Sequence, residues 1–232
     1  MDSKCDKCLV RELGALKQLN QEELKHLSKV KQELSFKKGD AIFSEGKTVS
    51  GVYCLRNGKC KLSRLNGNGK EQIVRFIKGG DLIGYRSLFS DEPVSLTVSA
   101  LENMEACYIP KDEIMRLMKS NNDFAMGMLK EVCHVLKVTN DSLAKMAQKS
   151  VKERLADTLL SMEDSFGINE NGEIDLKLSR EEIASYIGTA TESAIRLISD
   201  LKKEGVISVK GKMIHIKDKE RLIHISEGFK LS

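Results

Sequence analysis

The sequence predicts an α+β fold in which an antiparallel β-roll comes first, a long helix follows, and a winged helix-turn-helix ends the chain. Three observations favour it. Nine of the seventeen glycines fall between Gly39 and Gly84 among short strand-like segments, a heptad repeat runs through residues 123–149, and two closely spaced helix signatures precede a hairpin pattern near the C-terminus. We place the domains at residues 1–120, 121–149 and 150–232.

The composition is that of an ordinary folded protein. Of 232 residues, 41% are hydrophobic and 31% are charged, which excludes a disordered chain. No apolar run approaches the ~20 residues needed to cross a bilayer, and the N-terminus lacks the apolar segment of a signal peptide. We therefore expect a cytoplasmic protein with no membrane partner, whose six cysteines are thiols or ligands rather than disulfides.

A capping-box pattern opens the first predicted helix. Asn20 is followed three residues later by Glu23, and the apolar residues that come next share one helical face. These apolar residues are Leu24, Leu27 and Val30. We expect this helix to cover the domain that follows it.

Strand-like segments fill the chain from about residue 32 to residue 109. Residues 52–55 and 94–98 are among them, and turn signals such as Asn57-Gly58 and Asn66-Gly67 separate them. Many short strands with dense glycine turns favour an antiparallel roll or sandwich over a parallel sheet, because the strands of a parallel sheet alternate with helices.

The next helix is expected to start at Pro110, with Asp112 and Glu113 in its first turn, where the helix dipole favours acidic residues. The long helix after it carries an apolar seam with steps of three and four residues. The seam consists of Leu129, Val132, Leu136, Thr139, Leu143 and Met146.

Two copies of such a helix would pair as a coiled coil, although a single amphipathic helix more commonly packs on its own domain. Met128, Val135 and Val138 widen the apolar surface enough to face both a roll and a partner. We therefore expect a homodimer.

The last domain begins with a predicted helix over residues 151–165 and a polar loop over 167–172. Ser179 and Glu182 form a second capping box, which opens a short helix that Gly188 ends. A second helix follows at once, which is the helix-turn-helix pattern.

A third capping-box pattern, Thr189 with Glu192, marks the start of that second helix. One of its faces is apolar and is expected to be core, and it consists of Ala194, Leu197, Ile198 and Leu201. The opposite face carries Glu192, Arg196, Ser199 and Lys203. In the major groove, a carboxylate accepts a hydrogen bond from cytosine N4, and a guanidinium donates two hydrogen bonds to guanine O6 and N7. We therefore expect Arg196 to be the main specificity residue. Ile195 either touches a thymine methyl or caps the core.

A β-hairpin pattern over residues 206–209 and 213–216 follows, with the basic tip Lys210-Gly211-Lys212. Bulk charge does not indicate nucleic acid, because residues 151–232 hold 13 Lys and Arg against 15 Asp and Glu, yet residues 196–217 carry a net charge of +4. The hairpin is expected to be a wing that meets phosphates. The DNA-binding candidates are Thr189, Thr191, Glu192, Ser193, Arg196, Ser199, Lys203 and Lys212.

Four segments resemble those of the cyclic-AMP receptor protein and fumarate-nitrate regulator (CRP/FNR) transcription factors. They are KKGDAIFSEG (37–46), GGDLIGYRSLF (79–89), ERLADTLL (153–160) and LSREEIASYIGTATESAIRLISDLKKEGVI (178–207). The resemblance is closest to the FNR-like branch. It implies a cyclic-nucleotide-binding-like roll, a homodimer on palindromic double-stranded DNA, and base contacts by Glu192 and Arg196. It also implies a contact with RNA polymerase near residues 44–48 or Asp112.

The effector is unknown. Family members that bind cyclic AMP carry a glutamate after the glycine of the GDLIG-like segment and an arginine-serine pair beyond it, which hold the ribose and the phosphate. This sequence has Tyr85, Ser95 and Leu96 at those positions. A buried phosphate without a cationic partner is costly. Arg86 is a nearby substitute, but we do not expect cyclic AMP to bind.

Three cysteines resemble iron-sulfur ligands of the oxygen-sensing branch. They are Cys5, Cys8 and Cys107, and the remaining family ligand would fall on Gly14. An incomplete iron-sulfur site, a zinc-like pair, a redox thiol pair and inert cysteines all stay open, so no cofactor is assigned. Cys54, Cys60 and Cys133 are interpreted as core or strand residues.

Two alternatives to an effector-controlled regulator follow. One is a ligand-independent regulator whose roll serves only as a platform for dimerisation and polymerase contact, and the other is a redox or iron-sulfur sensor that uses the three cysteines. An enzyme is not expected, because no histidine has metal or triad spacing with another candidate. The histidines are His26, His134, His215 and His224.

Overall fold

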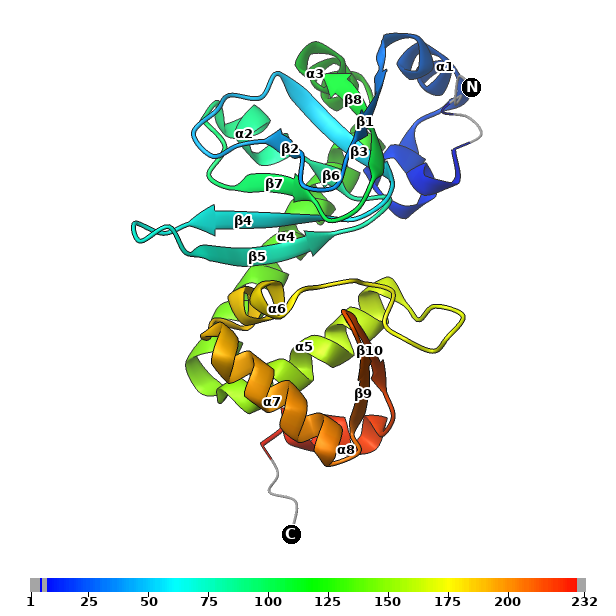
Figure 1. Ribbon diagram of the computed structural model, residues 1–232. Coiled ribbons are helices and arrows are strands. Elements are labelled where there is room, and N and C mark those ends of the chain that lie inside the picture. The colour runs from blue at the N-terminus through cyan, green and yellow to red at the C-terminus, as the bar shows by residue number, and fades with distance from the viewer. Residues whose placement is uncertain (1–4, 6–7, 229–232) are drawn as a thin grey trace. The chain divides into compact units, whose positions relative to one another are not determined.

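A computed structural model describes residue 5 and residues 8–228 (Figure 1). The chain divides into two compact units, each with its own core. The first comprises Met1–Arg64 and Val74–Val138, and the second comprises Leu65–Ile73 and Thr139–Ser232.

Two four-stranded sheets form the β-roll, as the strands and glycine turns predict. The first has the order β1-β8-β3-β6, and its strands are Gln32–Phe36, Met104–Pro110, Gly51–Asn57 and Leu82–Ile83. The second has the order β2-β7-β4-β5, and its strands are Ala41–Phe43, Thr97–Ala100, Cys60–Leu65 and Glu71–Ile77. The central strands β8 and β7 pair antiparallel with both of their neighbours.

Alternation along the strands divides the apolar residues between two cores. Leu55 and Ala106 belong to a cluster between the two sheets, together with Val98 of β7. Val52, Cys54 and their neighbours face the other side of the first sheet, where helices cover them. This second core includes Leu24 and Leu27 of α1 (Gln21–Val30), Ile114 and Leu117 of α3 (Lys111–Ser120), and Phe124 and Met128 of α4 (Asn122–Gln148).

The first capping box is confirmed. The Asn20 side chain accepts from the backbone of Glu22 and Glu23, and the Glu23 carboxylate accepts from the backbone of Asn20. Two predicted boundaries are wrong. The strand expected over residues 94–98 begins at Thr97, and α3 begins at Lys111 with Pro110 as its N-cap, because Pro110 is still the last residue of β8.

The second unit begins with the last part of α4 and continues with α5 (Val151–Phe166), α6 (Arg180–Ile187), α7 (Thr191–Lys203), the hairpin β9 (Ile207–Lys210) and β10 (Met213–Ile216), and α8 (Lys219–Ser226). Its core includes Leu155, Leu159, Ile183, Ala194, Leu201 and Leu222. Within the described residues, no helix is long and apolar enough to span a membrane.

Candidate nucleic-acid interface

The short helix α6 begins at the predicted capping box. The Ser179 hydroxyl accepts from the backbone N–H of Glu182 at 3.1 Å, and the Glu182 carboxylate accepts from the backbone N–H of Ser179 at 2.7 Å. Gly188 ends the helix with φ +67°, in the left-handed region that glycine enters without strain. Both predictions are confirmed.

The third capping box is wrong. Helix α7 begins at Thr191, its N-cap is Ala190, and no side chain caps it. The backbone N–H of Thr189 instead donates to the carbonyl of Ala184 at 3.0 Å, so Thr189 belongs to the turn that closes α6. Because Thr189 belongs to this turn, α7 begins two residues later, at Thr191.

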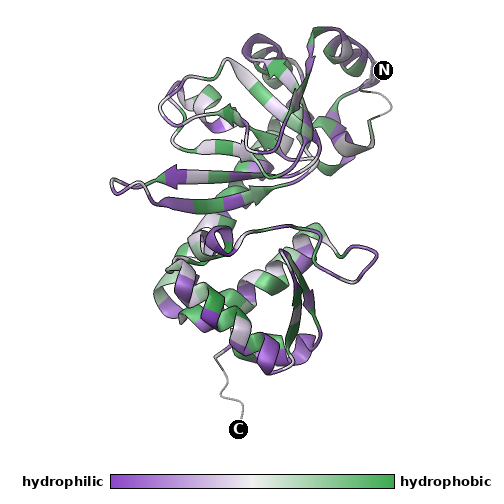
Figure 2. Ribbon diagram, in the orientation of Figure 1, coloured by the Kyte–Doolittle hydropathy of each residue, from purple (hydrophilic) through white to green (hydrophobic). Residues whose placement is uncertain are grey.

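Helix α7 has the two faces that the sequence predicts, and its ribbon changes repeatedly between hydrophobic and hydrophilic colours (Figure 2). Ala194, Ile198 and Leu201 are buried, whereas Leu197 is only half-buried. The buried positions fix the orientation of the helix in its unit.

The opposite face of α7 is open. Glu192 and Arg196, one helical turn apart, are exposed, as is Lys203, and Ser193 and Ser199 are half-exposed. Within the described residues, the side chains of Glu192, Arg196 and Lys203 take part in no hydrogen bond or ion pair. These groups are free to contact another molecule.

The predicted hairpin is present next in the chain. β9 and β10 pair antiparallel, with Lys210 opposite Met213 and Ile216 opposite Ile207. The tip residues Gly211 and Lys212 are exposed, as is Lys210. The hairpin therefore presents two ammonium groups at its end.

Arg180 is a candidate that the sequence reasoning missed. It lies in the first turn of α6, and its Nη2 donates to the carbonyl of Gly211 at the hairpin tip, at 3.1 Å. Its Nη1 is buried and has no hydrogen-bond partner among the described residues, and burial lowers the pKa of the guanidinium. The sequence signal that could have identified Arg180 is its position, because a cationic residue is unusual at a helix N-terminus, where the helix dipole favours acidic residues.

The turn of the helix-turn-helix is held against the end of α4. Arg154 donates from Nε to the carbonyl of Ile187 at 2.9 Å and from Nη1 to the carbonyl of Lys149 at 2.8 Å. A Cβ at Gly188 would lie 3.4 Å from the Met146 side chain. One guanidinium therefore bonds both the segment that follows α4 and the turn before α7.

The predicted seam on α4 is exposed along its whole length. The exposed fractions of Leu129, Leu136 and Leu143 are 53%, 59% and 65%, and Val132, Thr139 and Met146 are exposed too. Met128, by contrast, is 1% exposed and packs in the roll. The helix therefore presents a second apolar face that its own roll leaves uncovered.

Tyr85, which the resemblance aligns with a glutamate, starts α2 (Tyr85–Ser90) and is buried. Burial raises the pKa of Tyr85. Arg86 donates to the Glu92 carboxylate at 3.3 Å and to the Ser95 hydroxyl at 3.1 Å. Arg86, the substitute that the sequence offered, is thus already bound to an acid.

Cys5 and Cys54 are buried, Cys8 and Cys107 are half-buried, and all six cysteines are free thiols. Cys60 is buried in β4, but Cys133 is exposed on α4, so its interpretation as a core or strand residue is wrong. Among the described residues, no three His, Cys, Asp or Glu side chains are arranged to hold a metal ion as they stand.

Two domain families match the chain. The cyclic nucleotide-binding domain matches residues 33–121, and the Crp-like helix-turn-helix domain matches residues 153–225.

Curated relatives match over most of their length. The CRP-like cAMP-activated global transcriptional regulator of Mycobacterium tuberculosis is 27% identical over 84% of this chain and 88% of its own. The fumarate and nitrate reduction regulatory protein of Escherichia coli is 27% identical over 96% of this chain and 90% of its own.

Among solved structures, FixK2 from Bradyrhizobium japonicum has the same fold, with a TM-score of 0.77 at 23% identity over 88% of this chain and 99% of that one. A cyclic-nucleotide-binding-like roll, a Crp-like helix-turn-helix and relatives of both branches together show that the chain belongs to the CRP/FNR family of DNA-binding transcription regulators.

Proposed function

We propose that this regulator binds palindromic double-stranded DNA as a homodimer and reads its sequence with Glu192 and Arg196. One observation carries the proposal: both side chains are exposed and unpaired within the described residues, on the face of α7 opposite to the buried Ala194, Ile198 and Leu201. A guanidinium suits guanine O6 and N7, and a carboxylate suits cytosine N4.

The other candidates suit the DNA backbone. Hydroxyl and ammonium groups bind phosphates, which contribute affinity and register but no sequence information. We assign this role to Thr189, Thr191, Ser193, Ser199, Lys203 and Lys212. Lys212 at the hairpin tip and the hydroxyls at the start of α7 would then hold the backbone on two sides of the base-reading pair.

The proposed dimer forms through α4. Leu129, Leu136 and Leu143 are more than half exposed in one heptad register, and burying such a stripe against a second copy removes it from water. A two-fold dimer presents two α7 helices, so the expected operator has two half-sites about one DNA turn (~34 Å) apart.

The roll is proposed to sense an effector other than cyclic AMP. Tyr85 is buried at the position of the family's ribose-binding glutamate, and Arg86 is paired with Glu92. A second candidate, sensing by Cys5, Cys8 and Cys107, is favoured by the contact between Lys31 and Cys107. A ligand-independent roll remains the alternative, and RNA polymerase is the proposed protein partner in each case.

The test starts from the purified full chain and a library of random DNA duplexes. Repeated selection is expected to enrich a two-fold symmetric sequence. Affinities for the selected duplex and for a scrambled duplex are then measured for the wild type, Arg196→Ala and Arg64→Ala. Arg64 is an exposed arginine on β4, so its replacement makes the same change in net charge.

Arg196→Ala is expected to weaken binding of the selected duplex by ~1–3 kcal/mol and to leave scrambled DNA nearly unaffected. Arg64→Ala should bind both duplexes like the wild type. Enrichment of no symmetric sequence, or an unchanged preference in Arg196→Ala, contradicts the proposal.

A further inference from the structure

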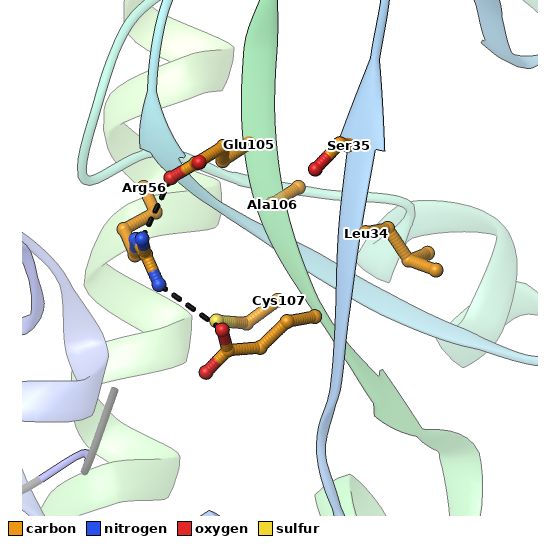
Figure 3. Close-up of a pocket in the computed structure, with 7 residues that line it drawn as sticks. Leu34, Ser35, Arg56, Glu105, Ala106 and Cys107 are labelled. Carbon is orange, nitrogen blue, oxygen red and sulfur yellow. Dashed lines mark hydrogen bonds and ion pairs between the residues drawn. The ribbon is translucent and has the colours of Figure 1, made fainter. Parts of the chain in front are cut away.

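The recess in the roll and the open face of α7 differ in how their charged groups are paired. In the recess, Arg56 of β3 donates to the Glu105 carboxylate of β8 at 2.7 Å and to the Glu33 carboxylate of β1 at 3.3 Å (Figure 3). A ligand there would first have to break these ion pairs. The face of α7 needs no such rearrangement, because within the described residues the Glu192 and Arg196 side chains are exposed and unpaired.

Helix α7 also carries one exposed apolar side chain among its polar ones. Ile195 is 48% exposed, whereas the other large apolar residues of the helix, Leu197, Ile198 and Leu201, are half-buried or buried. All of α7 lies within the described residues. The sequence left open whether Ile195 caps the core or meets a thymine methyl, and its exposure favours a role outside the core.

Ile195 lies on the face of α7 that is proposed to read bases. It follows Glu192 by three residues and precedes Ser199 by four, and residues at these spacings are neighbours on a helix surface. At ~100° per residue, the order across the face is Ile195, Ser199, Glu192 and Arg196. The reading face therefore has an apolar edge at Ile195 and a cationic edge at Arg196.

The conformation of Ile195 is restricted before any DNA binds. Isoleucine is branched at Cβ, and in a helix one χ1 rotamer accounts for about 90% of isoleucine side chains. Ile198, which follows three residues later, is 3% exposed, so Ile195 stands at the border between the core and solvent. A side chain that is already confined to one rotamer loses little conformational entropy when it makes a contact.

An apolar side chain in the major groove suits one group there. The base edges present hydrogen-bond donors and acceptors, and the 5-methyl of thymine is their apolar group. If Ile195 covered the amine of cytosine or adenine, that donor would lose its water without gaining a new acceptor, which is costly. A 5-methyl group carries no such cost, because its contact with Ile195 removes apolar surface from water.

The spacing along α7 limits which base pair carries this methyl. The Cα atoms of Ile195 and Arg196 are ~3.8 Å apart, which is about one base-pair step of ~3.4 Å. The two side chains therefore reach base pairs within about two steps of each other. A G·C pair whose guanine Arg196 reads presents no methyl, so the methyl belongs to a flanking pair.

We propose that Ile195 is a specificity-determining residue that recognises the 5-methyl group of a pyrimidine within two base pairs of the guanine read by Arg196. The recognised group is the methyl and not the whole base, so a methyl strengthens binding on thymine relative to uracil and on 5-methylcytosine relative to cytosine. Operator binding therefore responds to cytosine methylation at this position. The inference rests on the proposed operator binding and adds the chemical group that Ile195 reads.

Duplexes that differ by one methyl group per half-site test the inference. The operator is first selected from random DNA, and the guanine for which Arg196→Ala loses its preference locates the flanking pairs. Synthetic duplexes then carry thymine, uracil, cytosine or 5-methylcytosine at each flanking position in both half-sites. Fluorescence anisotropy measures the affinity of the full chain for each duplex. Thymine and uracil form the same hydrogen bonds with adenine, so their comparison changes the methyl alone.

At one flanking position the wild type is expected to prefer thymine over uracil by roughly 15-fold, because burial of a methyl-sized group contributes about fourfold in each of the two half-sites. The 5-methylcytosine duplex should gain by a similar factor over the cytosine duplex. In Ile195→Ala, whose side chain ends at Cβ, the methylated and unmethylated duplexes should agree within about twofold, which is the agreement expected of groups that do not interact.

Ile223→Ala is the matched control. Ile223 lies on α8, outside the helix-turn-helix, is 37% exposed, and loses the same atoms in the substitution. It should keep the wild-type preference for the methylated duplexes. The comparison of thymine with uracil in the wild type needs no variant, so it does not depend on how a variant folds.

The inference is refuted if the wild type binds methylated and unmethylated duplexes equally at every flanking position, if Ile195→Ala keeps the wild-type preference, or if Ile223→Ala loses it. Each of these results leaves the proposed function standing, because the operator and the role of Arg196 are measured in the first step. A selection that enriches no symmetric sequence refutes the proposed function, and the role of Ile195 with it.

Discussion

Arg180 joins the first helix of the helix-turn-helix to the tip of the wing, because its Nη2 donates to the carbonyl of Gly211 at 3.1 Å. The other terminal nitrogen, Nη1, is buried and has no hydrogen-bond partner among the described residues. The guanidinium lies beside the wing tip that is proposed to meet phosphates, and a DNA phosphate would bind it once the side chain turns Nη1 out of its buried position.

We predict that Arg180→Ala weakens binding of selected and scrambled duplexes to the same extent. The slope of log affinity against log salt concentration should become shallower by about 1, because one phosphate contact is lost. Fluorescence anisotropy over a series of KCl concentrations measures both quantities. Stability to urea should change by less than about 1 kcal/mol, since the variant also removes a buried unsatisfied group.

Arg196→Ala is the control for this prediction, because it should alter sequence preference and leave binding to scrambled DNA nearly unchanged. A loss in Arg180→Ala that is confined to the selected duplex would instead make Arg180 a base-reading residue.

The exposed seam of α4 predicts a dimer that one charge can break. Leu136 lies in the middle of the seam and is 59% exposed. Leu136→Glu should raise the dimer dissociation constant by at least ~100-fold, because like charges brought together across an interface cost several kcal/mol. Sedimentation equilibrium measures the constant, and the monomer should also lose affinity for the palindrome.

His134→Glu is the matched control for the seam. His134 is exposed on the same helix, at a heptad position away from the seam, and the substitution introduces the same charge. Equal dissociation of both variants would show that the charge acts through the helix as a whole, and a dimeric Leu136→Glu would place the interface elsewhere.

The local patterns of this chain were predictable, and the long-range ones were not. The capping boxes at Asn20 and Ser179 and the exposed seam on α4 follow from residues a few positions apart, whose contacts the helix itself fixes. The third predicted capping box is absent because the backbone N–H of Thr189 donates to the carbonyl of Ala184 in the turn that closes α6. The hydrogen-bond partner of the Thr189 amide depends on how α6 and α7 pack together.

Within the candidate sites, sequence reasoning found the α7 face but not Arg180. The exposed face of α7 follows from the helical period alone. The contact of Arg180 with Gly211 depends on where the wing folds back, and the position of Cys54 opposite Cys107 depends on the register of β3 with β8. Strand register between distant segments is set by the whole sheet, which no local pattern encodes.

Cyclic AMP is expected not to bind. The Tyr85 side chain is buried where a ribose-binding glutamate would be, and Arg86 is held by Glu92 and Ser95. Isothermal titration of the full chain with millimolar cyclic AMP should give no saturable heat, and the nucleotide should not change the affinity for the selected duplex. Saturable binding that Arg86→Ala abolishes would show that Arg86 leaves Glu92 to hold the phosphate.

An ion cluster at the end of α4 predicts a pH-dependent contribution to stability. Burial alone would raise the pKa of Asp157, but hydrogen bonds from Lys145 at 2.7 Å and Lys149 at 2.9 Å outweigh burial and lower it below its usual 3.8. The unfolded chain therefore binds this proton more readily than the folded one. The contribution is present above the usual carboxyl pKa and is lost as the pH falls through the lowered folded value.

Asp157→Asn should therefore destabilise the protein near neutral pH by on the order of 1 kcal/mol, and the difference from wild type should shrink below about pH 4. Urea unfolding at a series of pH values measures the difference. Asp164→Asn is the control on the same helix, because the Asp164 side chain is 74% exposed and lies 3.7 Å from its nearest cation, Lys219. It should change stability little at any pH. If the Asp157→Asn difference stays constant down to acid pH, the two lysines stabilise α5 by packing rather than through the Asp157 charge.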